Sequence, residues 1–130
     1  MNRLTAVVVV THGNAGEDMI SAAQSFLHMR IPCLATVRIE PEDDRAVVDG
    51  KIELAISTLG VTCKDDVLFL VDLIGSTPAR LCCNKCGGGH VVTGFNMPML
   101  LKLATADRTR GATALGNDLV ASGVKSIHCE

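Results

Sequence analysis

The chain has 130 residues, of which 48% are hydrophobic and 20% are charged, and its formal net charge is −2. A chain of this length and composition can bury a self-supporting core, which argues against intrinsic disorder and predicts a single domain over residues 1–130. The absence of Trp and Tyr and of a basic surplus argues against a nucleic-acid-binding protein, because such proteins use basic surfaces and aromatic stacking.

The N-terminal segment does not have the pattern of a signal peptide. The apolar run Leu4–Val10 is short, and Arg3 is the only cationic residue that flanks it. No apolar run in the chain approaches the ~20 residues that span a bilayer. We therefore expect a cytoplasmic protein, in which the six cysteines are reduced thiols.

Apolar patterning predicts strands and helices that alternate along the chain. Continuous or alternating apolar runs predict the strands, and apolar residues at spacings of three and four predict the helices. In chain order, the predicted elements are strand Leu4–Val10, helix Glu17–Met29, strand Leu34–Ile39, a helix from Asp43–Asp44 to about Leu59, strand Val67–Val71, a helix from Thr77 to about Cys86, strand His90–Thr93, a helix that begins at Asn96–Pro98 and includes Ala104, helix Ala112–Ser122 and strand Val124–His128.

The alternation predicts a doubly wound α/β fold with a mainly parallel sheet and helices on both faces. We expect the flavodoxin-like strand order 2-1-3-4, with Val124–His128 as a C-terminal edge strand. In this order the first and third strands are neighbours, and ligands bind beyond their carboxyl ends. His12 follows the first predicted strand and Asp72 follows the third, so the topology predicts that these two side chains lie at one edge of the sheet.

A histidine and a carboxylate in contact can carry out nucleophilic chemistry. The carboxylate of Asp72 would fix one ring nitrogen of His12 and leave the other free to attack. In the segment Gly75–Pro78 we predict Thr77 as N-cap and Pro78 as the first helical residue, so that the amide groups of a helix N-terminus can bind phosphate. The alternative is that His12 and Asp72 only cap or pack, and that the segment is only a turn.

Three segments resemble a known family, and they occur in its order and at compatible spacing. They are Thr11-His12-Gly13, then Phe69–Leu73 with Gly75–Pro78, then Val92–Leu100. Together they resemble the IIA component of the mannose-family sugar phosphotransferase system (PTS), over nearly the whole chain.

The resemblance implies a cytosolic phosphotransferase that works without a cofactor or a metal ion. In that family a histidine accepts a phosphoryl group from the phosphocarrier HPr and passes it to a IIB protein or domain. Homodimers are usual in the family, with the last strand pairing with the partner's sheet. Carried onto this chain, the resemblance implies the following roles: His12 is phosphorylated, Asp72 orients it, Gly75, Ser76 and Thr77 bind phosphate, and Asn96 lies on the other side of the site.

The chain departs from the family pattern around the third predicted helix. Ser76 stands where the family has a second glycine, and Ala79-Arg80 replace an aromatic residue and an amide. These changes leave phosphoryl acceptance plausible but leave the donor and acceptor proteins open. The alternatives are a regulatory phospho-sensor module and a phosphocarrier of the dihydroxyacetone kinase type. An aspartyl-phosphate receiver would need an acidic pair where this chain has Thr11-His12.

A cluster of cysteines suggests a second interpretation. Cys83 and Cys86 form one C-x-x-C, Cys82 is adjacent, and His90 follows four residues later. A structural zinc site usually needs four such ligands in paired motifs, and no second C-x-x-C is present. We therefore favour small buried apolar residues over a metal or redox site.

Overall fold

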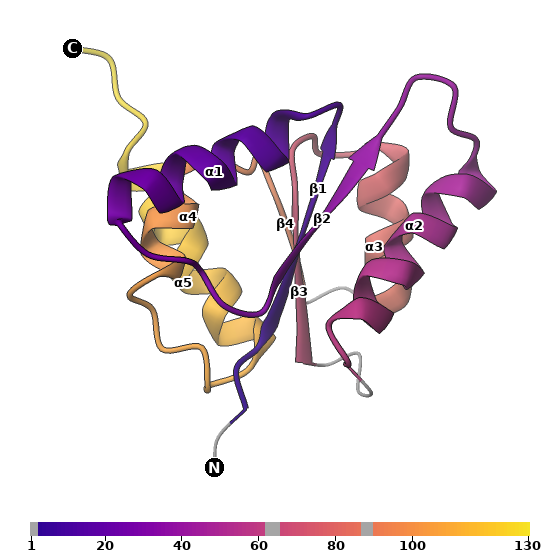
Figure 1. The fold of residues 1–130 in the computed structure, drawn as a ribbon. Helices are drawn as coiled ribbons and strands as arrows, with labels where there is room; N and C mark the ends of the chain where they lie inside the picture. The colour runs from indigo at the N-terminus through magenta and orange to yellow at the C-terminus, as the bar shows by residue number, and fades with distance from the viewer. Residues whose placement is uncertain (1–2, 62–65, 87–89) are drawn as a thin grey trace.

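The computed structural model describes residues 3–61, 66–86 and 90–130, and shows a parallel sheet between two layers of helices (Figure 1). The four strands lie in the order β2-β1-β3-β4, and every pairing is parallel. The predicted α/β class and strand order are therefore confirmed. In chain order the elements are β1 (Ala6–His12), α1 (Ala15–Leu27), β2 (Leu34–Ile39), α2 (Arg45–Thr58), β3 (Val67–Val71), α3 (Thr77–Cys86), β4 (Val91–Thr93), α4 (Met97–Leu103) and α5 (Ala112–Lys125).

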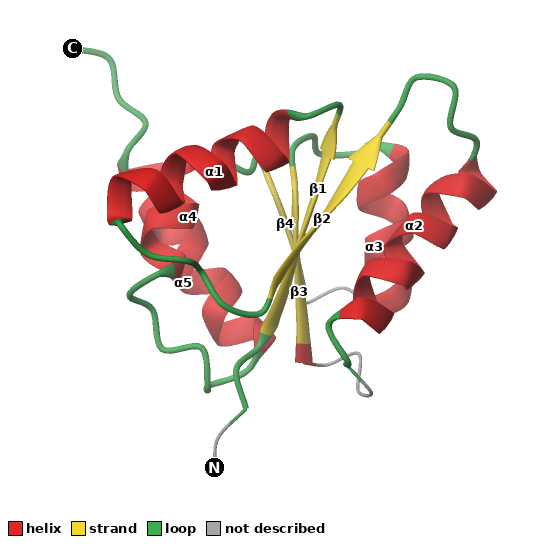
Figure 2. Ribbon diagram, in the orientation of Figure 1, coloured by secondary structure: helices red, strands yellow, loops and turns green. Residues whose placement is uncertain are grey.

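The two central strands are buried on both faces, as the unbroken apolar sequence of each predicts. Successive side chains of a strand point to opposite faces, so β1 and β3 supply two separate cores. Val8 and Phe69 pack with α2 and α3, whereas Val7 and Leu68 pack with α1, α4 and α5. Figure 2 shows the same division, with α2 and α3 on one side of the sheet and α1, α4 and α5 on the other.

The C-terminal segment differs from the prediction. Val124 and Lys125 belong to α5, and residues 126–130 hold no strand, so the predicted edge strand Val124–His128 is wrong for this structure. The helix continues because Gly123 lets α5 approach α4 closely. A Cβ atom at Gly123 would lie 2.7 Å from Cε of Met99.

Several boundaries shift by one or two residues. The ladder between β1 and β2 continues to the pair His12–Ile39, so β1 ends two residues later than predicted. Helix α1 ends at Leu27, and His28 forms its C-cap in the left-handed conformation. Within the described part of the chain, no helix is long and apolar enough to span a membrane.

Candidate active site

His12 and Asp72 lie side by side at the carboxyl edge of the sheet, although they are 60 residues apart in sequence. His12 is the last residue of β1, and Asp72 directly follows the adjacent strand β3. One carboxylate oxygen, Asp72 Oδ2, accepts hydrogen bonds from both the backbone N–H and the ring Nδ1 of His12, each at 2.9 Å. These two hydrogen bonds to Asp72 fix both the main chain and the imidazole ring of His12.

The contact selects one form of the imidazole. An ionised carboxylate only accepts hydrogen bonds, so Nδ1 carries the proton and Nε2 keeps its lone pair. Nε2 has no hydrogen-bond partner among the described residues. The His12 side chain is 48% exposed and that of Asp72 only 23%, so the ring is accessible while its anchor is sheltered. The contact therefore fixes the orientation of the ring and leaves Nε2 accessible from solvent.

The turn after His12 is held by a hydrogen bond that the sequence did not reveal. Thr11 is buried, and its Oγ1 accepts a hydrogen bond of 2.8 Å from the backbone N–H of Gly16 in α1. A Cβ atom at Gly16 would lie 2.9 Å from that oxygen and 3.0 Å from Cγ1 of Val9. A glycine is therefore needed for α1 to pack this closely against β1. Gly13, with a φ of 61°, makes the turn between them.

The loop before α3 differs in detail from the prediction. Helix α3 begins at Thr77, and Ser76 is its N-cap: Ser76 Oγ accepts from the backbone N–H of Ala79 at 3.3 Å. The same hydroxyl donates to the carbonyl of Leu73 at 2.9 Å. The predicted N-cap Thr77 is therefore one residue too late. The positive φ of this loop falls on Gly75, at 72°, so a serine at position 76 causes no backbone strain.

A pocket of about 370 Å³ opens beside His12. Thr77 is in its wall, so the start of α3 faces the same space as the imidazole. The rest of the wall comes from the end of β2, the loop after it and the start of α2. The residues that line the pocket are His12, Ile39, Glu40, Pro41, Asp43, Asp44, Arg45, Val48 and Thr77.

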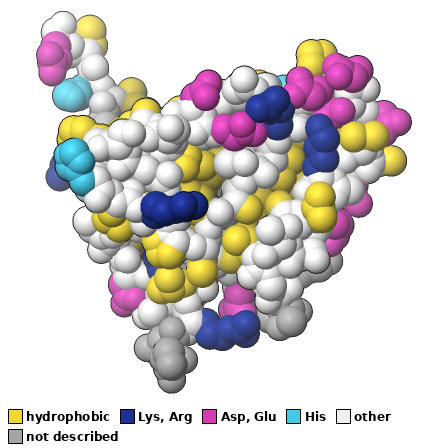
Figure 3. Space-filling view, in the orientation of Figure 1, with side chains coloured by type: hydrophobic (Ala, Val, Ile, Leu, Met, Phe, Trp, Pro, Cys, Tyr) yellow, Lys and Arg dark blue, Asp and Glu magenta, His cyan; other side chains and the backbone are white. Residues whose placement is uncertain are grey.

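Three carboxylates, those of Glu40, Asp43 and Asp44, line this wall. In Figure 3 acidic side chains gather at the upper right, above the end of β2 and the start of α2. Asp43 accepts from Lys51 Nζ at 2.6 Å and from the backbone N–H of Glu40 at 2.9 Å. The hydrogen bond from Lys51, and after it that from Glu40, lowers the pKa of the Asp43 carboxyl from its ordinary value, so it is ionised at neutral pH. Asp44 caps α2 through the backbone N–H of Val47.

Asn96 lies apart from this pocket. Its Oδ1 accepts from the backbone N–H of Met99 at 3.3 Å, which makes it the N-cap of α4. Its side-chain amide lies against Gly123 of α5. The structure therefore brings His12, Asp72 and Thr77 together, and it places the Asn96 side chain in the packing of α4 and α5.

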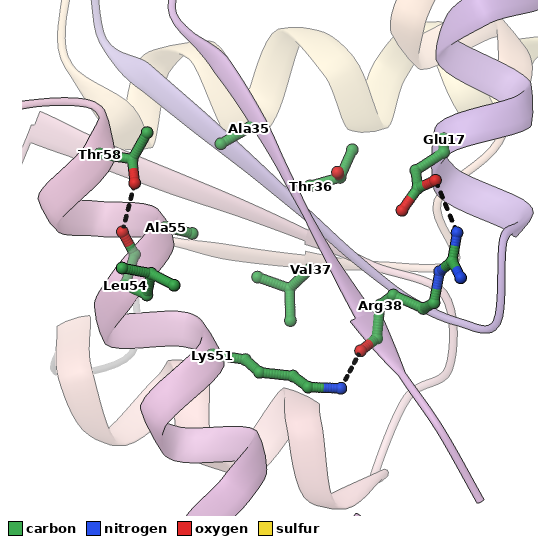
Figure 4. Close-up of a pocket in the computed structure, with 9 residues that line it drawn as sticks. All are labelled: Glu17, Ala35, Thr36, Val37, Arg38, Lys51, Leu54, Ala55 and Thr58. Carbon is green, nitrogen blue, oxygen red and sulfur yellow. Dashed lines mark hydrogen bonds and ion pairs between the residues drawn. The ribbon is translucent and has the colours of Figure 1, made fainter.

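A second groove, of about 340 Å³, runs along the outer side of β2 (Figure 4). It lies between Glu17 of α1 and the α2 residues Lys51, Leu54, Ala55 and Thr58. The Glu17–Arg38 ion pair, at 2.9 Å, closes one end. The groove contains no histidine or cysteine, and it exists because β2 is an edge strand between two helices.

The cysteine cluster does not form a metal site within the described residues. Cys82 is buried and Cys83 is exposed. The side chain of Cys86 and residues 87–89 lie outside the described part of the chain. Across that part, no three His, Cys, Asp or Glu side chains are grouped to hold a metal ion.

The fold and this site define a class: doubly wound α/β proteins with a carboxylate-anchored histidine at the strand-order switch point. The family model for the "PTS system fructose IIA component" (EIIA-man) matches residues 6–120, and the chain therefore belongs to this family. By sequence, no protein with a curated description matches the chain.

The solved structures with the same fold include proteins from Enterococcus faecalis, Streptococcus pneumoniae and Streptococcus agalactiae. A mannose/sorbose-specific IIA subunit of the phosphotransferase system from Enterococcus faecalis has a TM-score of 0.84 and 20% identity, over 98% of this chain and 96% of that one. A PTS IIA protein associated with the fucose utilization operon of Streptococcus pneumoniae has a TM-score of 0.78 and 20% identity, over 99% and 96%. Component EIIA from Streptococcus agalactiae has a TM-score of 0.78 and 18% identity, over 95% of each chain.

Proposed function

We propose that the protein is a cytoplasmic phosphohistidine carrier, which accepts a phosphoryl group from HPr on His12 and passes it to a IIB protein or domain. The contact between His12 Nδ1 and Asp72 Oδ2 is the observation that supports this proposal most strongly. It leaves Nε2 as the nucleophile, at a partly exposed ring beside the N-terminus of α3.

The transfer needs no other reactant. The lone pair of His12 Nε2 forms a bond to phosphorus while the bond between phosphorus and the donor's histidine nitrogen breaks. The electron pair of the broken bond returns to the donor's imidazole ring. The proton on Nδ1 stays in the hydrogen bond to Asp72, so the positive charge on the ring faces a carboxylate. Transfer to the IIB partner reverses these bond changes with a new acceptor.

Labelling tests the proposal directly. The purified chain is incubated with phosphoenolpyruvate, enzyme I and HPr, and its mass and the modified peptide are determined. We expect one acid-labile phosphoryl group on the peptide that contains His12. A chain that stays unmodified while HPr is phosphorylated in the same tube would overturn the proposal.

Asp72→Asn should slow this transfer about 10- to 100-fold, the loss expected for one charge-assisted hydrogen bond in the transition state. The asparagine keeps the size of the side chain but not the negative charge that stabilises the phosphorylated ring. Rapid-quench labelling with HPr measures the rate. Asp118→Asn, at a surface ion pair with Arg110, is the control and should match the wild type. A wild-type rate for Asp72→Asn would rule out the orienting role.

We also propose a homodimer formed through the C-terminal region. Val124 and Ile127 are 62% and 72% exposed, and the segment after α5 extends away from the rest of the chain (Figure 1). Ile127→Asp should shift the protein from dimer to monomer in analytical ultracentrifugation. Leu54→Asp, at an equally exposed site on α2, should leave the dimer intact. Equal sedimentation of the two variants would contradict this assignment.

A further inference from the structure

Acidic side chains outnumber basic ones in the wall of the pocket beside His12. Three carboxylates line it, and each already has a partner. Asp43 is bound to Lys51, Asp44 caps α2, and Glu40 lies 3.7 Å from Nε of Arg38. The other charged side chain in the wall is Arg45, which forms no ion pair with any described residue.

A phosphoryl group on His12 would bring up to two negative charges to this acidic wall. Like charges at close range repel, and the repulsion is stronger where the pocket excludes part of the solvent. Lys51 cannot offset it, because its ammonium group is held by Asp43 and by the carbonyl of Arg38. Among the residues that line the pocket, Arg45 is therefore the cationic side chain that is available to contact a phosphoryl group on His12.

The position of Arg45 is also unfavourable for α2. It is the first residue of the helix, directly after the N-cap Asp44. The positive end of the helix dipole lies here, so a cation at this position destabilises the helix slightly. Helix stability therefore does not favour an arginine at this exposed position, whereas a bound anion beside it would offset the unfavourable interaction with the helix dipole.

We propose that Arg45 is a phosphate-binding residue, whose guanidinium contacts the phosphoryl group on His12 during transfer. The proposal rests on the proposed function and extends it to a residue outside the motifs of the family. A planar guanidinium can bind two phosphoryl oxygens at once and keeps its charge at every physiological pH. The start of α2 would then face the start of α3 across the phosphoryl group.

The test uses a small donor, phosphoramidate, beside HPr, so that contacts with phosphate are separated from contacts with a protein. Phosphoramidate transfers its phosphoryl group to Nε2 as its P–N bond breaks and ammonia leaves. We expect Arg45→Gln to slow labelling by both donors about tenfold and Arg45→Lys to slow it less. Arg30→Gln, an exposed arginine beyond α1 that does not line the pocket, is the matched control and should leave both rates unchanged.

A second measurement does not depend on rates. In ³¹P NMR spectra of the phosphorylated protein, Arg45→Gln should raise the pKa of the phosphoryl group, because a neighbouring cation that favours the dianion is removed. Arg30→Gln should leave the pKa of the phosphoryl group unchanged.

The possible results are distinct. If Arg45→Gln slows labelling by HPr but not by phosphoramidate, Arg45 contacts the protein donor and the proposal is wrong. An unchanged ³¹P titration would overturn it as well. If HPr does not label the wild type but phosphoramidate does, the donor in the proposed function is wrong, and the comparison of variants still decides the role of Arg45. If neither donor labels His12 in the wild type, both proposals fail.

Discussion

Replacing His12 with alanine is expected to abolish phosphoryl acceptance while leaving the protein folded. Alanine has no nitrogen to form the bond to phosphorus, and His12 is the one histidine among the residues that line this pocket. The side chain is 48% exposed, so its removal should change the free energy of unfolding by less than about 1 kcal/mol. The measurement is the number of phosphoryl groups bound per chain after incubation with phosphorylated HPr.

Histidine variants outside the pocket provide the control. His28, at the C-cap of α1, and His128, in the C-terminal segment, are both exposed. His28→Ala and His128→Ala should take up one phosphoryl group at the wild-type rate. If His12→Ala still accepts a phosphoryl group, or if His128→Ala loses it, then the nucleophile is a different residue and the assignment of this pocket fails.

The juxtaposition of His12 and Asp72 could be predicted from the sequence because topology fixes it. Once β1 and β3 are recognised as buried parallel strands and placed side by side, the residues at their carboxyl ends meet at the same edge. This prediction needs only the strand order and no side-chain detail. The ends of the elements were less predictable. The apolar run that predicts the first strand ends at Val10, but β1 continues through the polar residue Thr11, which is buried because its hydroxyl accepts a hydrogen bond from the backbone N–H of Gly16.

Features that depend on packing between distant segments could not be predicted from the sequence. The alternation of Val124–His128 is typical of a strand, but Gly123 lets α5 lie close to α4, and the helix runs on to Lys125. Arg45 resembles any surface arginine until the pocket beside His12 is seen. The sequence pattern around Arg108 does not predict its burial or its hydrogen bonds either, because its partners lie about 75 to 103 residues away in sequence.

Arg108 holds together the end of the sheet opposite to the candidate active site. It is 4% exposed and lies in the connection between α4 and α5. Its guanidinium donates to the carbonyls of Pro32, of Thr5 at 2.6 Å and of Cys33 at 2.9 Å, and its own carbonyl accepts from Thr5 N–H at 2.7 Å. Burial lowers the pKa of this group from its ordinary value, but arginine remains charged at physiological pH.

Arg108→Met should lower the free energy of unfolding by about 3 kcal/mol, as measured by urea denaturation. Methionine fills much of the volume but removes the guanidinium from three carbonyls, of which that of Cys33 keeps the backbone N–H of Val7 as a donor at 3.0 Å. Hydrogen bonds from a charged group contribute about 1.5–3 kcal/mol each before the cost of burying the charge is subtracted. Arg108→Lys should recover only part of the loss, because one ammonium group cannot reach all three carbonyls in the guanidinium geometry.

The matched control is Arg110→Met, two residues along the same connection. Arg110 is 56% exposed and lies 3.7 Å from Asp118, so its replacement should change the free energy of unfolding by no more than about 0.5 kcal/mol. The folded fraction of Arg108→Met should still accept a phosphoryl group, because the pocket beside His12 lies at the other edge of the sheet. A loss below 1 kcal/mol for Arg108→Met would mean that water replaces the guanidinium at these carbonyls, and that Arg108 does not hold β1 to the segment before β2.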